Sequence, residues 1–461
     1  MNDTKHKDYD SYAAKWLRCR AACEGQSAVH AGGETFLPKL IGQSVASYEN
    51  YKLRATYFNA AGRTLDGLVG MVFRKPIEVT APAGLPDIID DIDLAGTPLE
   101  GLAMHVMGEV VKAGRIGLLV EYPQVAQQPT SAAGASALNL RPYVSAYAAE
   151  SIIDWKLKRV NNAMQPVMIK LMEIFETKVN EYDYKTEPQI RTLLLIDGAY
   201  IQEIYRKQGE KKEWVLVETI TPLMNNKPIP FIPFWAFGGK SNTLELQQPP
   251  IEPLADLNLA HYRVSADYEN GCHITGIPTP ILAGFTLGEN ETINLGAGGG
   301  YATQDPSAKW GFLEFTGQGL GALLENLKLK EAQMAAIGAR FLAPDKAGVE
   351  AAATLLMRSN GETSVLATMA NLVSQNLQDM FEFIAQWAGI SGTISIKLST
   401  DFLPATMSSQ DLDSIIKSWQ AGGIPKQELF NALKRGEVLT EQITFEEYSD
   451  MLETAAPILA V

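Results

Sequence analysis

Cysteine is scarce in this chain of 461 residues, which has only Cys19, Cys23 and Cys272. Three thiols make no disulfide framework, so we expect the chain to fold in a reducing cytoplasm. The sequence also lacks any run of about eighteen apolar residues, which argues against a membrane-spanning helix and a membrane partner. Its first residues are charged and carry no apolar segment, so a secretory signal peptide is not expected.

Residues that could bind a metal are equally sparse. The chain has five histidines: His6, His30, His105, His261 and His273. No two of them have the spacing of a metal-ligand pair. Cys19 and Cys23 are one helical turn apart, but no second pair completes a site. A metal site is therefore not predicted.

Three short stretches approach nucleotide-binding or catalytic motifs, and each lacks a required part. Gly239-Lys240-Ser241 has the end of a phosphate-binding loop, but Phe234 stands where that loop needs glycine. "GAGGGY" at 296–301 is not followed by a helix, and "GQSVA" around Ser44 is not preceded by a strand. We interpret them as a turn, a hairpin tip and a helix surface. No catalytic or cofactor site is predicted, and an enzyme with a scattered site is the alternative.

Acidic residues exceed basic ones, with 53 Asp and Glu against 39 Lys and Arg, and the net charge is −14. This balance argues against tight, static binding to nucleic acid, because affinity for a duplex depends mainly on Lys and Arg at the phosphates. It leaves open a surface that DNA passes without adhering. At this length we expect about two to four structural units.

Periodicity along the first half predicts helices followed by strands. Residues 1–36 read as a polar arm, and helical spacing then continues to Pro76 as one long helix or a pair. A helix is predicted over 99–113, with a short strand directly after it. From 142 to 220 the signals are those of strands, and the last two form a hairpin with a charged turn. "KPIPFIPFWAFGG" is too rich in proline for a central strand and is interpreted as an extended connector.

Long helices dominate the second half. One is predicted over 253–272 and another over 318–338, with strand fragments between them. An apolar stripe over 365–387 predicts a third, which Gly389 ends. A strand and two short helices complete the chain.

The first of these long helices carries an apolar seam with no evident partner in the same subunit. The seam residues alternate three and four apart: Leu254, Leu257, His261, Val264 and Tyr268. We therefore predict that this seam is an interface between subunits, and that His261 is either an interface residue or a core residue with one hydrogen bond.

The order of these features resembles the bacteriophage portal proteins, the head-tail connectors of tailed phages, and among them a divergent branch. The resemblance rests on "ETFLPKLIG" and "YFNAAGRTLDGLVGMVFRKP" near the start, and on two long helices around a β-rich insertion. It rests also on "GARFLAPDKAGVEAAATLLMRSNGETSVLATMANL" after them. It extends from about Phe36 to the C-terminal helices, and its motifs are structural rather than catalytic.

The resemblance implies a portal-type α+β fold with an α/β wing, a two-helix stem, a small β-rich clip, a long channel-wall helix and a short helical crown. The implied ranges begin with the N-terminal arm at 1–36, the wing at 37–250, the first stem helix at 251–276 and the clip at 277–315. The second stem helix follows at 316–339, the tunnel loop and start of the channel helix at 340–362, the long helix and a wing-completing strand at 363–400, and the crown at 401–461.

The resemblance also implies a homo-oligomeric ring, usually of twelve subunits, at one vertex of the viral capsid. Double-stranded DNA would pass through its channel during packaging and ejection, without sequence specificity. The implied partners are the terminase large subunit, the major capsid protein, a scaffold protein and a head-tail adaptor. The implied location is the virion, after assembly in the host cytoplasm. Another phage ring component, such as a connector or adaptor, is the alternative.

The implied tunnel loop agrees with the local sequence. Pro344 interrupts the helix, and the small side chains at 351–353 would let copies of one loop pack side by side around a channel. Arg340, Lys346 and Arg358 are the candidate DNA-facing residues, because a few basic groups would centre a polyanion inside an acidic ring. Alternatively, any of the three forms an ion pair between subunits.

Overall fold

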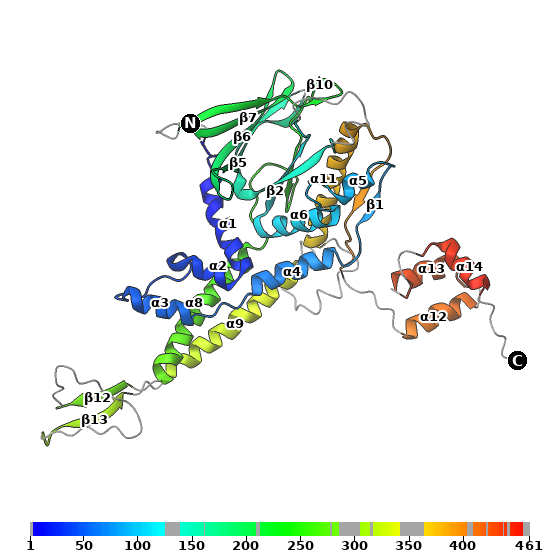
Figure 1. Ribbon diagram of the computed structural model, residues 1–461. Coiled ribbons are helices and arrows are strands. Elements are labelled where there is room, and N and C mark those ends of the chain that lie inside the picture. Colours follow the sequence, from blue (N-terminus) through cyan, green and yellow to red (C-terminus); the bar gives the residue numbers. More distant parts are fainter. Residues whose placement is uncertain are drawn as a thin grey trace. The chain divides into compact units, whose positions relative to one another are not determined.

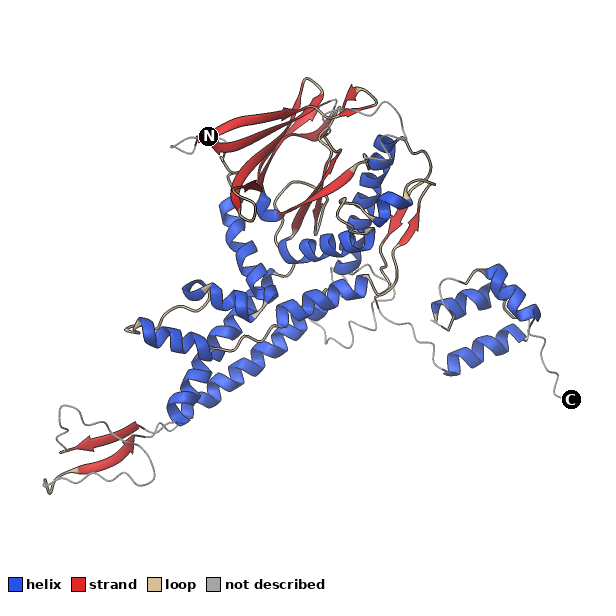
Figure 2. Ribbon diagram, in the orientation of Figure 1, coloured by secondary structure: helices blue, strands red, loops and turns tan. Residues whose placement is uncertain are grey.

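The computed structural model contains helices and sheets, so the prediction of a mixed α and β chain is confirmed (Figure 2). The chain folds into two compact units. The first comprises Met1–Gly70 and Ile77–Leu398, and the second comprises Met71–Pro76 and Ser399–Val461. The structure describes residues 3–124, 139–160, 162–208, 213–276, 279–284, 305–313, 317–341, 364–402, 409–420, 423–436, 438–439 and 443–454.

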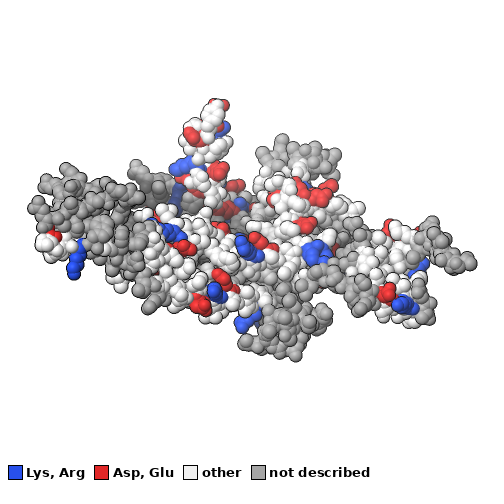
Figure 3. All heavy atoms as spheres, turned by 90° about the horizontal axis from the view of Figure 1, so that it is seen from below, with Lys and Arg blue, Asp and Glu red and all other residues white. Residues whose placement is uncertain are grey.

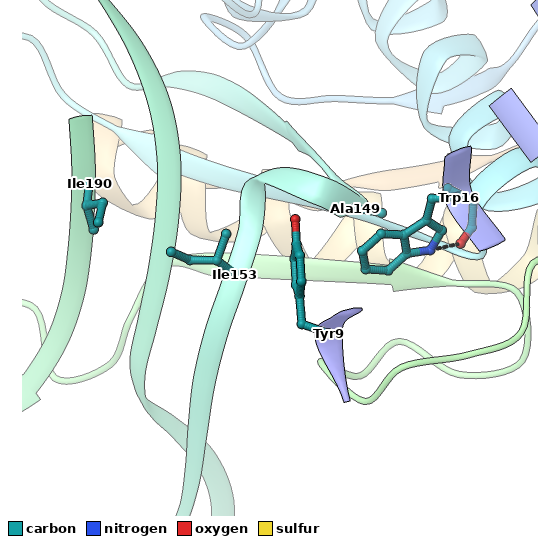
Figure 4. Packing of buried hydrophobic residues seen from close by; sticks show 6 residues of the cluster. Tyr9, Trp16, Ala149, Ile153 and Ile190 are labelled. Carbon is teal, nitrogen blue, oxygen red and sulfur yellow. Dashed lines mark hydrogen bonds between the residues drawn. The ribbon is translucent and has the colours of Figure 1, made fainter. Parts of the chain in front are cut away.

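The first 36 residues belong to the core, so their prediction as a polar arm is wrong. They form α1 (Tyr9–Glu24) and α2 (Gln26–Ala31), which are followed by the short helix η1 (Gly33–Thr35). Trp16 of α1 is fully buried, and its Nε1 donates a hydrogen bond to the Ala113 carbonyl at 3.0 Å (Figure 4). The cluster around it joins elements that are distant in sequence: Tyr9, Ala113, Ala149, Ile153 and Ile190.

Charged residues conceal the buried face of α1 in the sequence. Arg20 donates to Glu109 at 2.7 Å and also to Glu150, so a charged side chain of α1 points inward and is neutralised there. Pairing of this kind cannot be recognised from hydrophobic periodicity, because both partners count as polar.

The stretch after η1 folds as a pair of helices, which was one of the two alternatives. They are α3 (Val45–Arg54) and α4 (Ala60–Val72). Ser44 is the N-cap of α3, and its hydroxyl accepts a hydrogen bond from the Ser47 backbone N–H at 3.2 Å. The serine of "GQSVA" therefore starts a helix and does not lie on the surface of one.

A three-stranded antiparallel sheet follows. α6 (Leu99–Ala113) passes through Gly114, in a left-handed conformation with φ 73°, directly into β2 (Arg115–Glu121), as predicted. β2 lies between β3 (Tyr143–Ala148) and β11 (Phe234–Gly238). The proline-rich connector thus ends in an edge strand, a position that tolerates nearby prolines.

A five-stranded antiparallel sheet has the order β4-β5-β6-β7-β8, so each strand pairs with its neighbour in sequence. The strands are β4 (Ile152–Val160), β5 (Ala163–Lys178), β6 (Tyr184–Ile196), β7 (Ala199–Gln208) and β8 (Glu213–Ile220). The predicted hairpin of β7 and β8 is confirmed, with Gln208 opposite Glu213. The short helix η2 (Ala149–Ser151) separates β3 from β4 and directs them into different sheets.

The three long helices are confirmed: α8 (Glu252–Gly276), α9 (Gln318–Arg340) and α11 (Val365–Ala388). α8 and α9 pack side by side (Figure 1). The chain between them contains the antiparallel strands β12 (Thr279–Ala283) and β13 (Lys309–Leu313). Gly389, with φ 73°, ends α11 as predicted.

Short elements complete the first unit. They are β1 (Glu78–Thr80), α5 (Pro86–Asp90), β9 (Leu223–Met224), β10 (Lys227–Pro228) and β14 (Ser395–Lys397). β1 pairs with β14, and β9 pairs with β10, both antiparallel. α11 packs against β11, α6 and β14, so the long helix lies close to the three-stranded sheet.

In the described part of the second unit, three helices surround a small core of their own. They are α12 (Ser409–Gln420), α13 (Lys426–Arg435) and α14 (Phe445–Thr454), and the core residues are Leu429, Phe430, Leu433 and Tyr448. Two helices were predicted here, and α14 was missed. Its start is a reciprocal capping box, in which Thr444 N–H donates to Glu447 at 2.9 Å and Glu447 N–H donates to the Thr444 hydroxyl at 3.2 Å.

Candidate functional site

The predicted seam lies on α8, a helix that its own chain holds from several sides. At its start the buried Glu252 carboxylate lies 3.1 Å from Arg18 and 3.7 Å from Lys15, both on α1. Arg18 also contacts Asp256 at 2.9 Å. These contacts fix the first turns of α8 inside the subunit.

Two seam residues are buried within the single chain. Leu254 is fully buried and His261 is 4% exposed, because α8 packs against α1, α3 and α9. Leu254 therefore belongs to the core of its own chain and not to a subunit interface, and His261 is a core residue, which was one of its two alternatives. Leu257, Val264 and Tyr268 are half-buried, and their place in an interface remains a prediction.

Asn258 of α8 has a structural role that the sequence did not reveal. Its side-chain oxygen accepts a hydrogen bond from Ala61 N–H at 2.9 Å, and its amide donates to the Phe58 carbonyl at 2.7 Å. Both groups of one buried amide are thus used to hold the start of α4 against α8. The partners are about 200 residues apart in sequence, so no local pattern indicates this contact.

The outer surface of α9 is the part of this helix pair that is most exposed to solvent. Among its residues whose side chains the structure describes, Leu327 and Met334 alone are buried. Leu324 is 37% exposed and Leu329 is 58% exposed. Small exposed residues accompany them: Gly319, Gly321, Ala322, Ala332, Ala335 and Ala336. Small side chains let another helix approach closely, and the leucines favour burial against it.

His261 joins the two helices through a contact that depends on protonation. Its Nε2 lies 3.4 Å from Glu331 Oε1 on α9, and its ring packs against Phe58. Burial is the largest effect and lowers the His261 pKa below 6.5. The Glu331 carboxylate raises this pKa, and the Lys330 ammonium group lowers it further. The net direction is downward, so the folded chain favours the neutral ring.

We expect acid to destabilise the first unit partly through this histidine. His261 takes up a proton near pH 6.5 in the unfolded chain but stays neutral there in the folded chain. Its contribution to the free energy of unfolding is therefore complete above that pH and falls as the pH decreases. The thermal midpoint should therefore fall less between pH 7.5 and pH 5.5 in His261→Gln than in the wild type. Equal pH dependence in the two proteins would contradict this assignment.

The structure describes Arg340 alone among the three candidate DNA-facing residues. Arg340 is the last residue of α9 and is exposed. Lys346 and Arg358 lie outside the described residues. The ends of the intervening segment meet, because Leu366 N–H donates to the Phe341 carbonyl at 3.1 Å. The described residues at the two ends of the candidate tunnel segment, 340–362, therefore lie next to each other.

The stretch that resembles a phosphate-binding loop is a turn, as predicted. The backbone N–H groups of Lys240 and Ser241 donate to Gln247 Oε1 at 2.8 and 3.3 Å. These amides are already occupied, whereas a phosphate loop needs them free to point at the anion. "GAGGGY" at 296–301 lies outside the described residues.

The cysteines of α1 are unsuited to metal binding. Burial raises the pKa of Cys19 and of Cys23 to about 12, so both thiols stay protonated at neutral pH. Within the described residues, no group of three His, Cys, Asp or Glu side chains is placed to hold a metal ion.

Charge is mixed on one face of the described residues. On the face seen in Figure 3, Lys and Arg alternate with Asp and Glu and form no large area of one sign. In the described part of the chain, no helix is both long enough and apolar enough to cross a membrane.

Comparison with known protein families matches part of this chain. Residues 250–388, which include α8, α9 and α11, match the family model of a domain of unknown function, DUF4055. The comparison with curated proteins gives no match.

Three solved structures are similar to this chain at low sequence identity. The neck of an empty GTA particle, with C6 symmetry, is 13% identical with TM-score 0.41, over 87% of this chain and 95% of that one. The neck of a native GTA particle, with C12 symmetry, is 13% identical with TM-score 0.38, over 81% of this chain and 89% of that one. The virion of a native gene transfer agent (GTA) particle is 12% identical with TM-score 0.38, over 87% of this chain and 96% of that one.

Proposed function

We propose that this chain is a phage portal protein. It forms a ring of identical subunits, which we expect to number twelve, at one vertex of the capsid. Double-stranded DNA passes through the ring during packaging and ejection, and the ring provides the docking site for terminase and for the head-tail adaptor.

The observation that carries this proposal is the outer surface of α9. A helix of 23 residues leaves Leu324, Leu329 and a row of glycines and alanines exposed while its other side packs on α8. At about 1.5 Å per residue such a helix is roughly 35 Å long. Exposed leucines and small residues along this length, with the exposed charges of Glu325 and Lys328 among them, favour contact with the same helix pair of a neighbouring subunit.

The structural elements can be assigned to the parts of a portal. The two sheets with α6 form the wing, α8 and α9 the stem, β12 and β13 the clip, α11 the channel wall, and α12 to α14 the crown. In this scheme the clip faces the terminase and later the adaptor, and the wing faces the major capsid protein and scaffold. The protein is then located in the virion, after assembly in the host cytoplasm.

The ring is proposed to have no enzymatic activity of its own, because the terminase supplies the motor. We expect Lys240→Ala to leave DNA packaging within about twofold of the wild type, since Gln247 occupies the amides that a triphosphate would need. Nucleotide binding by the purified chain is measured by calorimetry. The proposal would be contradicted if the wild type binds ATP specifically and Lys240→Ala loses both this binding and DNA packaging.

Oligomer mass in solution, together with negative-stain images, tests the proposed function. A ring of about twelve copies with a central hole supports a portal. A monomer of enzyme size removes the proposal. A ring that binds the tail side of an assembled portal, and is dispensable for packaging, would identify another ring component instead.

A further inference from the structure

One hairpin extends beyond its sheet. β5 pairs with β4 only up to Leu171, and β6 pairs with β7 only from Gln189 onward. Residues 174–188 therefore form a two-stranded arm, in which Lys178 lies opposite Tyr184. At about 3.3 Å per residue the paired part is roughly 17 Å long.

The arm exposes large apolar side chains. Ile174 is 75% exposed, Val179 63%, Tyr182 85% and Tyr184 58%. A two-stranded hairpin alone is marginally stable in water. An arm of this composition is typical of a docking element rather than of a free surface loop.

A buried polar network fixes the arm at its base. Glu173 accepts hydrogen bonds from Tyr147 at 2.6 Å, from Gln189 at 2.5 Å and from Arg191 at 2.7 Å. Just above it, the Arg206 guanidinium stacks on the Phe175 ring at 3.5 Å. The direction in which the arm leaves the sheet is therefore set by the core.

The arm is acidic. It contains four carboxylates, of Glu176, Glu181, Asp183 and Glu187, against the two ammonium groups of Lys178 and Lys185. Lys185 lies 2.6 Å from Glu187, and the Asp183 carboxylate accepts from Asn180 at 2.5 Å. Glu176 and Glu181 are exposed, and neither forms an ion pair with another described residue.

The opposite end of the same sheet is basic. Lys156, Lys158 and Arg159 on β4 are all exposed, and none of them forms an ion pair with another described residue. The β6–β7 turn contributes one acid there, Asp197, and Met164 is 60% exposed beside them. Lys158 lies opposite Gln165, so this end and Glu176 are separated along β5 by about 36 Å.

We propose that the acidic arm of one subunit docks on the basic end of the five-stranded sheet of the next subunit. The two surfaces are complementary in charge, each has exposed apolar residues, and they cannot meet within one copy. Different patches that meet head to tail between identical chains generate a closed ring or a filament. The inference rests on the proposed ring and adds where neighbouring wings meet.

Reversal of charge tests the proposal in the full-length chain. Variant A carries Lys156→Glu and Lys158→Glu, and variant B carries Glu176→Lys and Glu181→Lys. Each places like charges in contact, so ring formation at low salt should require at least about tenfold more protein. An equimolar mixture of A and B should assemble into rings of alternating subunits, because every contact in it again joins opposite charges.

The control for variant B is Glu213→Lys with Glu218→Lys, which makes the same charge change as B on β8 of the same sheet. Ring fraction is measured by light scattering, and circular dichroism confirms folding. Salt of about 0.5 M should reduce the defect of A and B, since it screens exposed charges.

Three results would overturn the inference, and they are distinguishable. A wild-type chain that stays monomeric under all conditions removes the proposed function and this contact with it. Wild-type rings together with normal assembly of A and B leave the portal proposal standing and remove the arm contact. Defects in A and B that their mixture does not repair show that the charges act at separate places.

Discussion

Rings should not form when Leu329 is replaced by aspartate. Leu329 is 58% exposed in the single chain, so the free energy of unfolding should change by less than about 0.5 kcal/mol. In a ring built through α9, the new carboxylate would lose water at every subunit contact, at a cost of about 2 kcal/mol or more each. Light scattering should therefore find folded monomers where the wild type gives rings.

Two control variants separate assembly from folding. Leu254 is fully buried inside the chain, so Leu254→Asp should unfold the first unit, which Leu329→Asp should not do. Leu216 on β8 is 45% exposed and lies outside the proposed contacts, so Leu216→Asp should assemble normally. Rings of full mass from Leu329→Asp would show that α9 is not the stem surface.

The second large effect is expected at the tunnel segment. Arg340 ends α9, and Lys346 lies in the segment that leaves the chain just after it. Each residue would be repeated around a ring as a belt of positive charge, and a screening length of about 8 Å at physiological salt still lets it act on passing phosphates. Arg340→Glu with Lys346→Glu should give rings of normal mass whose capsids do not complete packaging or lose DNA.

Oligomer mass and packaged DNA, measured on one preparation, decide between the two roles of these residues. If they form ion pairs between subunits, the double change should weaken the ring itself. If rings are normal and heads are full and stable, neither residue acts on DNA. Arg340→Lys with Lys346→Arg keeps both charges and serves as the matched control.

Elements whose signal lies in one stretch of chain could be predicted. The stripe of α11 and its end at Gly389, the turn at Lys240 and the order of α8 and α9 around a β insertion all follow from local spacing. The candidate stem surface on α8 was only partly separated from the core: Leu254 and His261 are buried in the single chain, whereas Leu257, Val264 and Tyr268 are half-buried. An apolar seam on α8 looked unpartnered, yet α1, α3 and α9 of the same chain cover it.

The sequence by itself determined the long helices, the strand-rich middle, the absence of a complete catalytic motif and the resemblance to portal proteins. Tertiary structure alone decided which charged groups lie inside, as for Arg20 with Glu109, and which apolar groups stay outside, as for Leu329. Tertiary structure alone also placed the acidic arm and the basic end at opposite ends of the five-stranded sheet. The physical reason is that burial depends on partners hundreds of residues away, whereas periodicity reports only on neighbours within a few turns.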